Sequence, residues 1–220
     1  NTVTTNAGSY SLSAKYGDVV TLTVSKTGYS GCVIAASPIT VSSDATANVS
    51  GCTLNTYTIA VTNTAGAAVT ITGSTATNAT NPNSATSFNF SAKHGDNVSL
   101  SATKTGNTCS VTPSTISAIA ANTSVTVSCS TNTFTVGGTV SGLGSGKSVV
   151  LQNNGANSQT VTNPATSFSF PAQNDGTTYN VSVLTQPVGQ TCLVTNGSGT
   201  LAGANVTNVS VTCTDTTYTV

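Results

Sequence analysis

Alternating apolar and hydroxyl-bearing residues recur along most of the chain. The segment Val19–Val24 reads Val-Val-Thr-Leu-Thr-Val, and Val206–Val211 has the same period of two. Such alternation, rich in Val and Thr, predicts strands with one face buried and the other in water. Clusters of Gly, Asn, Pro and Ser interrupt the runs about every 8 to 12 residues, and helical periodicity is almost absent. The pattern therefore predicts an all-β protein.

The last third of the chain shows this pattern most clearly. Seven strands are expected there, over Thr133–Val140, Ser148–Gln152, Ser158–Val161, Ser167–Phe170, Tyr179–Leu184, Thr191–Thr195 and Val206–Cys213. Seven short strands in about 80 residues favour an antiparallel, immunoglobulin-like β-sandwich. The pairs Phe88/Phe90, Phe168/Phe170 and Tyr10/Leu12 each stand two residues apart, so each pair faces one side of its strand. We expect all three pairs to lie in a core.

The six cysteines follow a repeat. They form three pairs separated by 20, 20 and 21 residues, namely Cys32/Cys52, Cys109/Cys129 and Cys192/Cys213. An aromatic residue flanked by threonines follows each second cysteine, at Tyr57, Phe134 and Tyr218. The sequence therefore contains three copies of one module. We predict a first module over 1–52 that lacks its first strands, complete immunoglobulin-like modules over 53–129 and 130–213, and an opening strand over 214–220.

The two ends of the sequence do not match whole modules. Ser9–Asp18 matches Ser87–Asp96 and, more loosely, Ser167–Gly176. Upstream, Asn1–Thr4 matches Gln159–Thr162, so the first module starts about a third of the way in. One interpretation is a window from a longer tandem array. The other is strand complementation, in which Thr217, Tyr218, Thr219 and Val220 fill the vacant sheet edge of another copy. One observation argues against strand complementation: the final segment supplies one strand, whereas the first module lacks two.

The cysteine pairs indicate disulfides rather than metal. A structural zinc site needs four close ligands, whereas each module offers two cysteines and no Cys-x-x-Cys motif. Paired cysteines at a fixed spacing are typical of an oxidising compartment, so an extracellular or cell-surface location is expected. Closing a loop of this length should stabilise each module by about 3 kcal/mol in the chain-entropy model.

Charge is nearly absent from the chain. It has five Lys, five Asp, no Arg and no Glu, and a net charge of zero. This excludes the basic footprint of a nucleic-acid-binding protein and the Lys/Arg clusters that attach to anionic membranes. No apolar run reaches the roughly 18 residues that a membrane span needs. The sequence opens with no signal-peptide pattern, which fits a mature chain, a cropped one or a fragment. A surface of near-zero net charge favours self-association.

The titratable residues offer little chemistry. His94 with Asp96 could begin a Ser-His-Asp triad, but His94 takes the position of Tyr16 in the first module, so a structural role is expected. Asp18 and Asp96 recur in a Lys-x-Gly-Asp turn, and one carboxylate per module is too few for calcium. We therefore expect no catalytic residue, no metal site and no cofactor, and interpret both aspartates as turn residues.

The third module carries a recognisable set of motifs. These are Gly137–Leu143 (GGTVSGL), Val149–Gly155 (VLQNNG within it), Val183–Cys192 (ending in GQTC), Val194–Thr200 (VTNGSGT) and Asn205–Cys213 (NVTNVSVTC). The set resembles a tandem immunoglobulin-like repeat of large secreted or surface proteins of Gram-negative bacteria. The resemblance implies an extracellular stalk, adhesin or fibre module, and it brings no catalytic residues.

Two functions are carried forward. The first is a non-enzymatic extracellular structural protein, a segment of a stalk, filament or adhesin, whose partner is a second copy or the continuation of a longer repeat chain. The alternative is a module that binds a glycan or a protein, for which an exposed Tyr16, Tyr29 or Tyr179 would be the first candidate.

Overall fold

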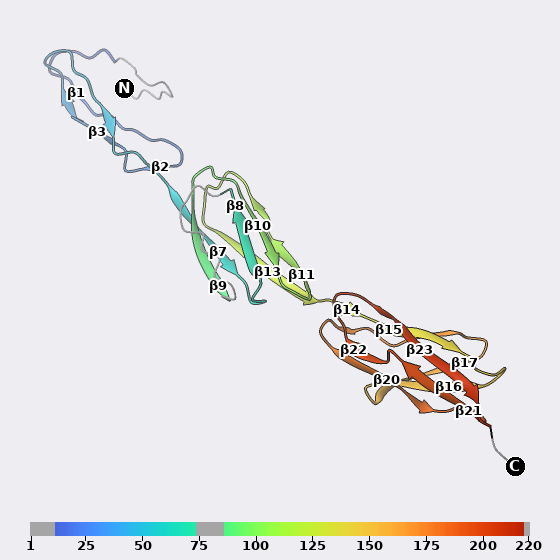
Figure 1. Ribbon diagram of the computed structural model, residues 1–220. Helices are drawn as coiled ribbons and strands as arrows, with labels where there is room; N and C mark the ends of the chain where they lie inside the picture. The colour runs from blue at the N-terminus through green and yellow to red at the C-terminus, as the bar shows by residue number, and fades with distance from the viewer. Residues whose placement is uncertain (1–11, 74–85, 218–220) are drawn as a thin grey trace.

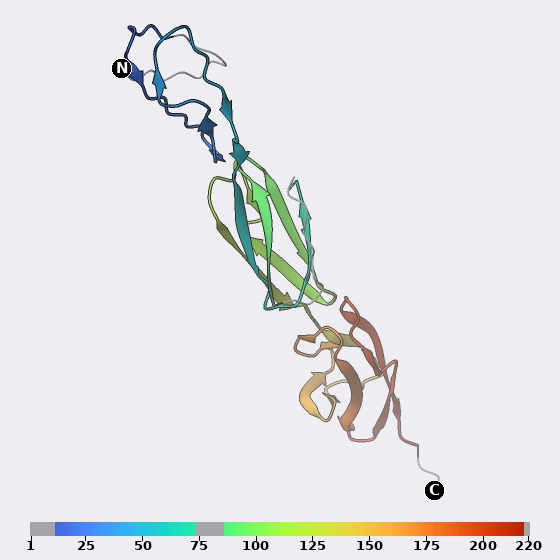
Figure 2. The same cartoon turned by 90° about the vertical axis from the view of Figure 1, so that its left-hand side faces the viewer.

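The computed structural model describes residues 12–73 and 86–217, and within these ranges every regular element is a strand. Three modules follow one another along an elongated molecule (Figures 1 and 2). We call residues 12–54, 56–131 and 133–215 the first, second and third modules; the single residues Asn55 and Asn132 join them. No helix in the described ranges is long and apolar enough to cross a membrane.

The third module is a two-sheet sandwich. Its strands are β14 (Thr133–Phe134), β15 (Val136–Ser141), β16 (Ser148–Asn153), β17 (Ala156–Thr162), β18 (Ser167–Ser169), β19 (Gln173–Asn174), β20 (Thr178–Thr185), β21 (Gln190–Thr195), β22 (Ser198–Thr200) and β23 (Val206–Asp215). One sheet has the order β18-β15-β23-β21 and the other β17-β16-β20-β22. The seven strands expected from the sequence are all present. The short strands β19 and β22 were not predicted.

Alternation along the strands produces the core of this module. Val149 and Leu151 of β16 are fully buried, and Phe168 and Phe170 pack edge-to-face with ring centroids 5.7 Å apart. The expected inward orientation of this aromatic pair is thus observed. Burying a side chain of this size stabilises the fold by about 2 kcal/mol, so the aliphatic and aromatic interior is the main source of stability.

The second module repeats this arrangement. Its strands are β7 (Thr56–Thr62), β8 (Ala68–Thr72), β9 (Ser87–Lys93), β10 (Val98–Thr103), β11 (Asn107–Thr112), β12 (Thr115–Ile116) and β13 (Thr123–Thr131). Sheets of order β12-β10-β8 and β11-β13-β7-β9 enclose a core that includes Ile59, Phe90 and Leu100. Phe88 packs against the core and is only partly buried.

One strand pair in each complete module is parallel, which the antiparallel expectation did not include. The opening strand β7 pairs in parallel with the final strand β13, from Ile59 opposite Thr123 to Thr62 opposite Thr126, and β15 pairs in parallel with β23. An asparagine side chain at the start of each final strand accepts a hydrogen bond from the opening segment, Asn122 from Thr58 N and Asn205 from Thr135 N. Parallel strands are joined by long connections rather than tight turns, so no turn motif in the sequence predicts their pairing.

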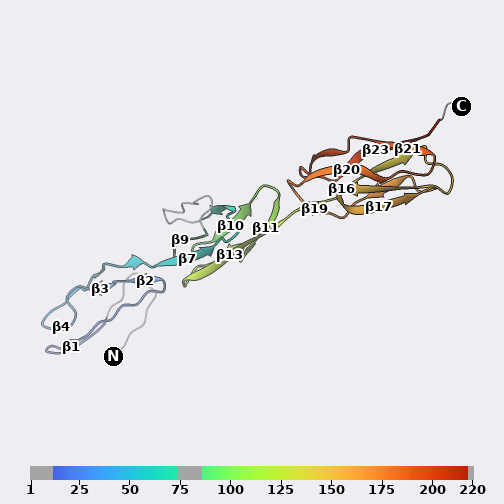
Figure 3. The same ribbon diagram turned by 90° about the horizontal axis from the view of Figure 1, so that it is seen from below.

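The first module has short ladders and no buried residue. Its strands are the two-residue elements β1 (Val19–Val20), β2 (Tyr29–Ser30), β3 (Val33–Ile34), β4 (Ile39–Thr40), β5 (Val49–Ser50) and β6 (Thr53–Leu54). They pair as β1–β4, β2–β6 and β3–β5. None of residues 12–54 is buried. Leu12 is 37% exposed, so the expectation that it lies in a core was wrong, and Tyr10 lies outside the described residues. Figure 3 shows this module at the opposite end of the molecule from the third.

Each module contains one disulfide, as the fold class predicted. Cys109 bonds to Cys129 and Cys192 to Cys213, and in each case the two residues are direct neighbours on adjacent strands of one sheet. Cys32 bonds to Cys52 beside the β2–β6 ladder of the first module. The bridges therefore tie each final strand to its sheet neighbour and do not connect the two sheets.

Candidate functional site at the module junctions

A single linker residue joins the first two modules through two backbone hydrogen bonds. Asn55 N donates to the carbonyl oxygen of Gly28 in the first module, with an N–O distance of 2.7 Å. His94 N in the second module donates to the carbonyl oxygen of Asn55 at 2.8 Å. The peptide groups of one residue thus connect a turn of each module, and we call this arrangement the junction relay.

The second junction has the same relay. Asn132 N donates to Gly106 O in the second module at 2.9 Å, and Asp175 N in the third module donates to Asn132 O at 2.9 Å. Figure 3 shows β19, which precedes Asp175, at the end of the third module nearest to β11. The two junctions differ in the third residue, His94 or Asp175, and share the same pattern of backbone hydrogen bonds.

Repeated Lys-Thr-Gly turns provide the first half of the relay. Tyr29 N closes one turn on Lys26 O at 3.0 Å, and Asn107 N closes the other on Lys104 O at 3.1 Å. Gly28 has a φ of +79° and Gly106 a φ of +71°, which glycine adopts without strain. A Cβ atom at Gly28 would overlap the His94 imidazole, and one at Gly106 would lie 2.9 Å from Asp175 Oδ2. Both glycines thus also leave room for the following module.

A second repeated turn provides the other half. Gly95 N donates to Ile119 O and Gly176 N to Leu201 O, at 2.8 and 2.9 Å. The same bond occurs in the first module, from Gly17 N to Val41 O at 2.8 Å. His94, Asp175 and Tyr16, the residues that precede these glycines, are therefore equivalent. The sequence match had placed Asn174 opposite His94, which is wrong by one residue.

His94 is a packing residue of the first junction. Its ring lies 6.1 Å from the ring of Tyr57, centroid to centroid, on the side of Gly28. Its Nδ1 atom is buried and has no hydrogen-bond partner within the described chain. A Ser-His-Asp triad requires such a partner, so the described residues around His94 do not form one.

The two recurring aspartates stabilise their turns. Asp18 Oδ2 accepts a hydrogen bond from Lys15 N at 2.8 Å, and Asp96 Oδ2 accepts one from Lys93 N at 2.9 Å. Residues 12–73 and 86–217 contain no group of three His, Cys, Asp or Glu side chains that could hold a metal ion. The carboxylates thus serve the turn that carries the second half of the relay.

The candidate binding tyrosines have three different environments. Tyr16 is 86% exposed. Tyr29 is half-buried and carries the Lys26 ammonium 4.0 Å above its ring. Tyr179 belongs to the core of the third module at 8% exposure, so its candidacy as a contact residue was wrong. The described surface therefore offers one strongly exposed tyrosine rather than a cluster.

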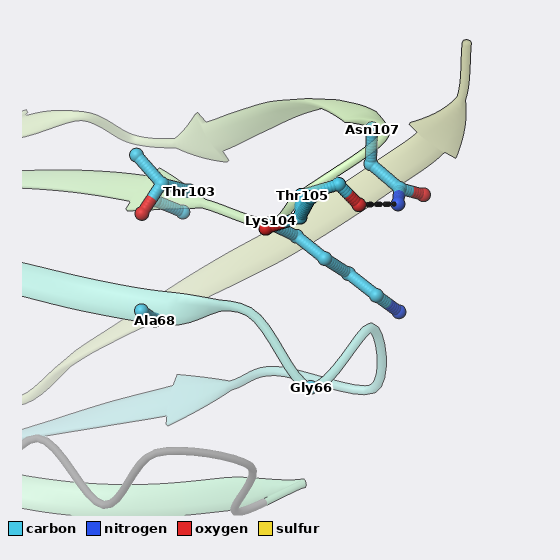
Figure 4. Close-up of a pocket in the computed structure, with 7 residues that line it drawn as sticks. Gly66, Ala68, Thr103, Lys104, Thr105 and Asn107 are labelled. Carbon is cyan, nitrogen blue, oxygen red and sulfur yellow. Dashed lines mark hydrogen bonds between the residues drawn. The ribbon is translucent and has the colours of Figure 1, made fainter. Parts of the chain in front are cut away.

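A shallow, open depression lies beside the second junction. Gly66, Ala68, Thr103, Lys104, Thr105 and Asn107 line it (Figure 4). Lys104 Nζ donates to Ala65 O at 2.7 Å, and Asn107 Nδ2 donates to Thr105 O at 2.8 Å. These polar groups are already engaged within the module, so the depression supports the junction turn and is no enclosed ligand site.

The fold and its junctions define a tandem β-sandwich repeat protein with one disulfide in each module. No protein-family model and no curated protein matches the chain. Among solved structures it is similar to "The Bacillus anthracis TIE protein", with 10% sequence identity and a TM-score of 0.45. That match covers 84% of this chain, which spans only 39% of the other.

The relay was not predicted from the sequence, and of its residues only His94 was singled out there, as a residue with a structural role. The signals were present in the repeated Lys-Thr-Gly segment and in the asparagine before Thr56 and Thr133. Reading them as a junction requires knowing that the two turns meet across a module boundary, which sequence periodicity does not reveal.

Proposed function

We propose that this chain is a non-enzymatic structural protein of the cell exterior, a spacer segment of a bacterial surface filament, stalk or adhesin. The observation that carries the proposal is the junction relay, present at both junctions with donor–acceptor distances of 2.7 to 2.9 Å. A linker of one residue, bonded on both sides, removes the freedom that flexible linkers give. Modules joined in this way hold a fixed direction over the length of the molecule.

The path of tension through the complete modules supports this role. The chain enters the second module in β7 and leaves it in β13, and these strands are adjacent and parallel. Pulling on the two ends slides the strands along each other, so the hydrogen bonds between them are strained together rather than one after another. The pair β15 and β23 repeats this arrangement in the third module.

The disulfides support the same role. They indicate an oxidising compartment, as found outside the cell. Cys129 lies two residues before the end of β13, and its bond to Cys109, at a sequence separation of 20, excludes the segment between them from any extension. The low charge of the chain also supports a structural role, because copies or neighbouring stalks can pack closely with little electrostatic repulsion.

The glycan- or protein-binding alternative finds less support. It calls for exposed aromatic side chains gathered on one module. Within the described chain Tyr179 is in a core and Tyr29 is half-buried, which leaves Tyr16 by itself.

Single-molecule pulling between the two ends tests the proposal. The second and third modules should unfold in separate, high-force steps. Reduction should lengthen each step by about 70 Å, the extended length of the roughly 20 residues that the disulfide holds. Gradual unfolding at low force would contradict a tension-bearing role. Electron microscopy of native material should show extended, narrow structures, and dispersed compact particles under oxidising conditions would count against the proposal.

A further inference from the structure

One segment of the first module has no strand partner among the described residues. In the second module Phe90–Lys93 forms the end of β9 and pairs with β7, with Tyr57 opposite Ala92 and Thr56 opposite Lys93. The equivalent segment of the first module, Leu12–Lys15, pairs with no strand in the described residues. Leu12 is 37% exposed, whereas Phe90 is 3% exposed. Within the described residues, no strand of the first module takes the position that β7 occupies in the second.

The far end of the third module has half of a junction relay already formed. Thr216 N donates to Gly189 O at 3.0 Å, as Asn55 N does to Gly28 O. Within the described chain no donor reaches Thr216 O. Gly189 and Thr216 are exposed, while their equivalents at both junctions are half-buried. Beside them Val188 is 91% exposed. This end therefore forms the first of the two relay hydrogen bonds, and no described residue forms the second.

The chain beyond Thr216 repeats the opening strand. Thr217-Tyr218-Thr219-Val220 corresponds to Thr56-Tyr57-Thr58-Ile59 and to Thr133-Phe134-Thr135-Val136. The residues Tyr218–Val220 lie outside the described ranges. In the two described cases the aromatic residue packs against the core of the module that follows it.

We propose that a second copy of this chain docks head-to-tail on the first module. Tyr16 N of one copy donates to Thr216 O of the other and completes the relay, and the exposed Tyr16 ring covers Gly189. Thr217–Val220 then lies along Leu12–Lys15, with Thr217 opposite Lys15 and Tyr218 opposite Ala14. This is β-strand addition, in which the backbone ladder gives affinity and the side-chain pockets give register. It rests on the proposed structural role and extends it to a self-assembled filament.

The composition of the two surfaces suits this partner. Position 189 has no side chain to obstruct the incoming turn, and its φ of +70° matches those of Gly28 and Gly106. Covering Leu12 removes apolar surface from water, at about 25 cal/mol per Å². The internal junctions also have the help of a covalent linker, which raises the effective concentration of the two surfaces. Assembly between copies is therefore expected to depend steeply on protein concentration.

Paired cysteine substitutions test both the contact and its register. The variant Lys15→Cys/Thr217→Cys, mildly oxidised at high protein concentration, should give a ladder of covalent multimers joined through positions 15 and 217. The matched control is Lys93→Cys/Thr217→Cys. Lys93 has the same local sequence, but its sheet position is already occupied by Thr56. The control pair should give no multimers above the level of either single variant, and peptide mapping by mass spectrometry identifies the bonds formed.

Deletion of residues 217–220 provides the second test. The third module ends with β23 at Asp215, so the shortened chain should keep the thermal unfolding of that module. It should no longer assemble in sedimentation experiments at any concentration at which the full chain does. A full chain that stays monomeric, equal ladders from both cysteine pairs, or unchanged assembly after the deletion would overturn the inference. An extended monomer that unfolds at high force would still support the proposed structural role, so the two failures are distinguishable.

Discussion

The first and second modules have nearly the same pattern of apolar and polar residues, but they differ in how far the apolar side chains are buried. Leu12 and Leu22 of the first module correspond to Phe90 and Leu100 of the second. Phe90 and Leu100 are 3% and 4% exposed, whereas Leu12 is exposed and Leu22 half-buried. In the second module, β7 and β8 precede the strands that carry Phe90 and Leu100 in the sequence. The described part of the first module has no equivalent of β7 and β8. An amphipathic strand thus needs the opposing sheet before its apolar face contributes to stability.

The largest expected difference between modules comes from core truncation. Phe170→Ala should lower the free energy of unfolding of the third module by about 3 to 5 kcal/mol, because it empties a close-packed site. The equivalent change Leu12→Ala should cost less than about 1 kcal/mol in the monomer. Urea unfolding followed by hydrogen exchange separates the modules. Equal costs would mean that the first module has a packed core.

Removal of single disulfides should have the next largest effect. The pairs Cys32→Ser/Cys52→Ser and Cys192→Ser/Cys213→Ser each remove about 3 kcal/mol of stabilisation in the chain-entropy model. The hydrophobic core of the third module should keep it folded without the disulfide, so its amides should still exchange slowly. The first module has no buried residue in the described range and should lose its protection. Hydrogen exchange at neutral pH checks this, and retained protection in the first module would contradict the comparison.

A buried asparagine in the second module tests how much the connection between β7 and β8 contributes to the stability of that module. Asn63 is fully buried in the turn between β7 and β8, where its Nδ2 donates to Ala67 O at 2.8 Å and its Oδ1 accepts from Ala67 N at 3.1 Å. Asn63→Ala should destabilise the second module by about 1 to 3 kcal/mol, because it leaves backbone groups unsatisfied. The exposed Asn89→Ala is the control, expected within about 0.5 kcal/mol of the parent chain in the same unfolding assay.

The smallest effect on stability is expected at the first junction. Gly28→Ala places a methyl group against His94, while Gly17→Ala meets a similar positive φ in open space. Both should change the stability of the second module by less than about 1 kcal/mol. Small-angle scattering should nevertheless detect a shorter maximum dimension for Gly28→Ala alone. Identical scattering from both variants would show that the relay does not hold the junction straight.

Local patterns were good predictors of local structure. The alternation at Val149–Leu151 and the spacing of Phe168 and Phe170 were enough to predict their strands and inward orientation. The cysteine spacing likewise predicted one bridge per module. These features depend on residues close in the sequence or on an exact repeat.

Features that depend on distant contacts were missed. The parallel pairing of β7 with β13 joins segments more than sixty residues apart, with no turn motif to announce it. Tyr179 was named as a candidate surface contact residue, yet it is 8% exposed and its ring packs in the core of the third module. The one-residue offset at Asp175 became visible only when the hydrogen bond to Asn132 O was known.

The sequence by itself determined the period of the strands, the repeat and the partners of the cysteines, because each depends on spacing along the chain. Only the tertiary structure decided which apolar positions are buried and how modules meet. Burial depends on the opposing sheet, which Phe90 has and Leu12 lacks in the described residues. The junction relay depends on backbone groups, which every residue carries, so the repeated Lys-Thr-Gly segment and the asparagines do not by themselves show that two turns meet there. Asn55 and Asn132 gain their role from the turns that lie on either side of them.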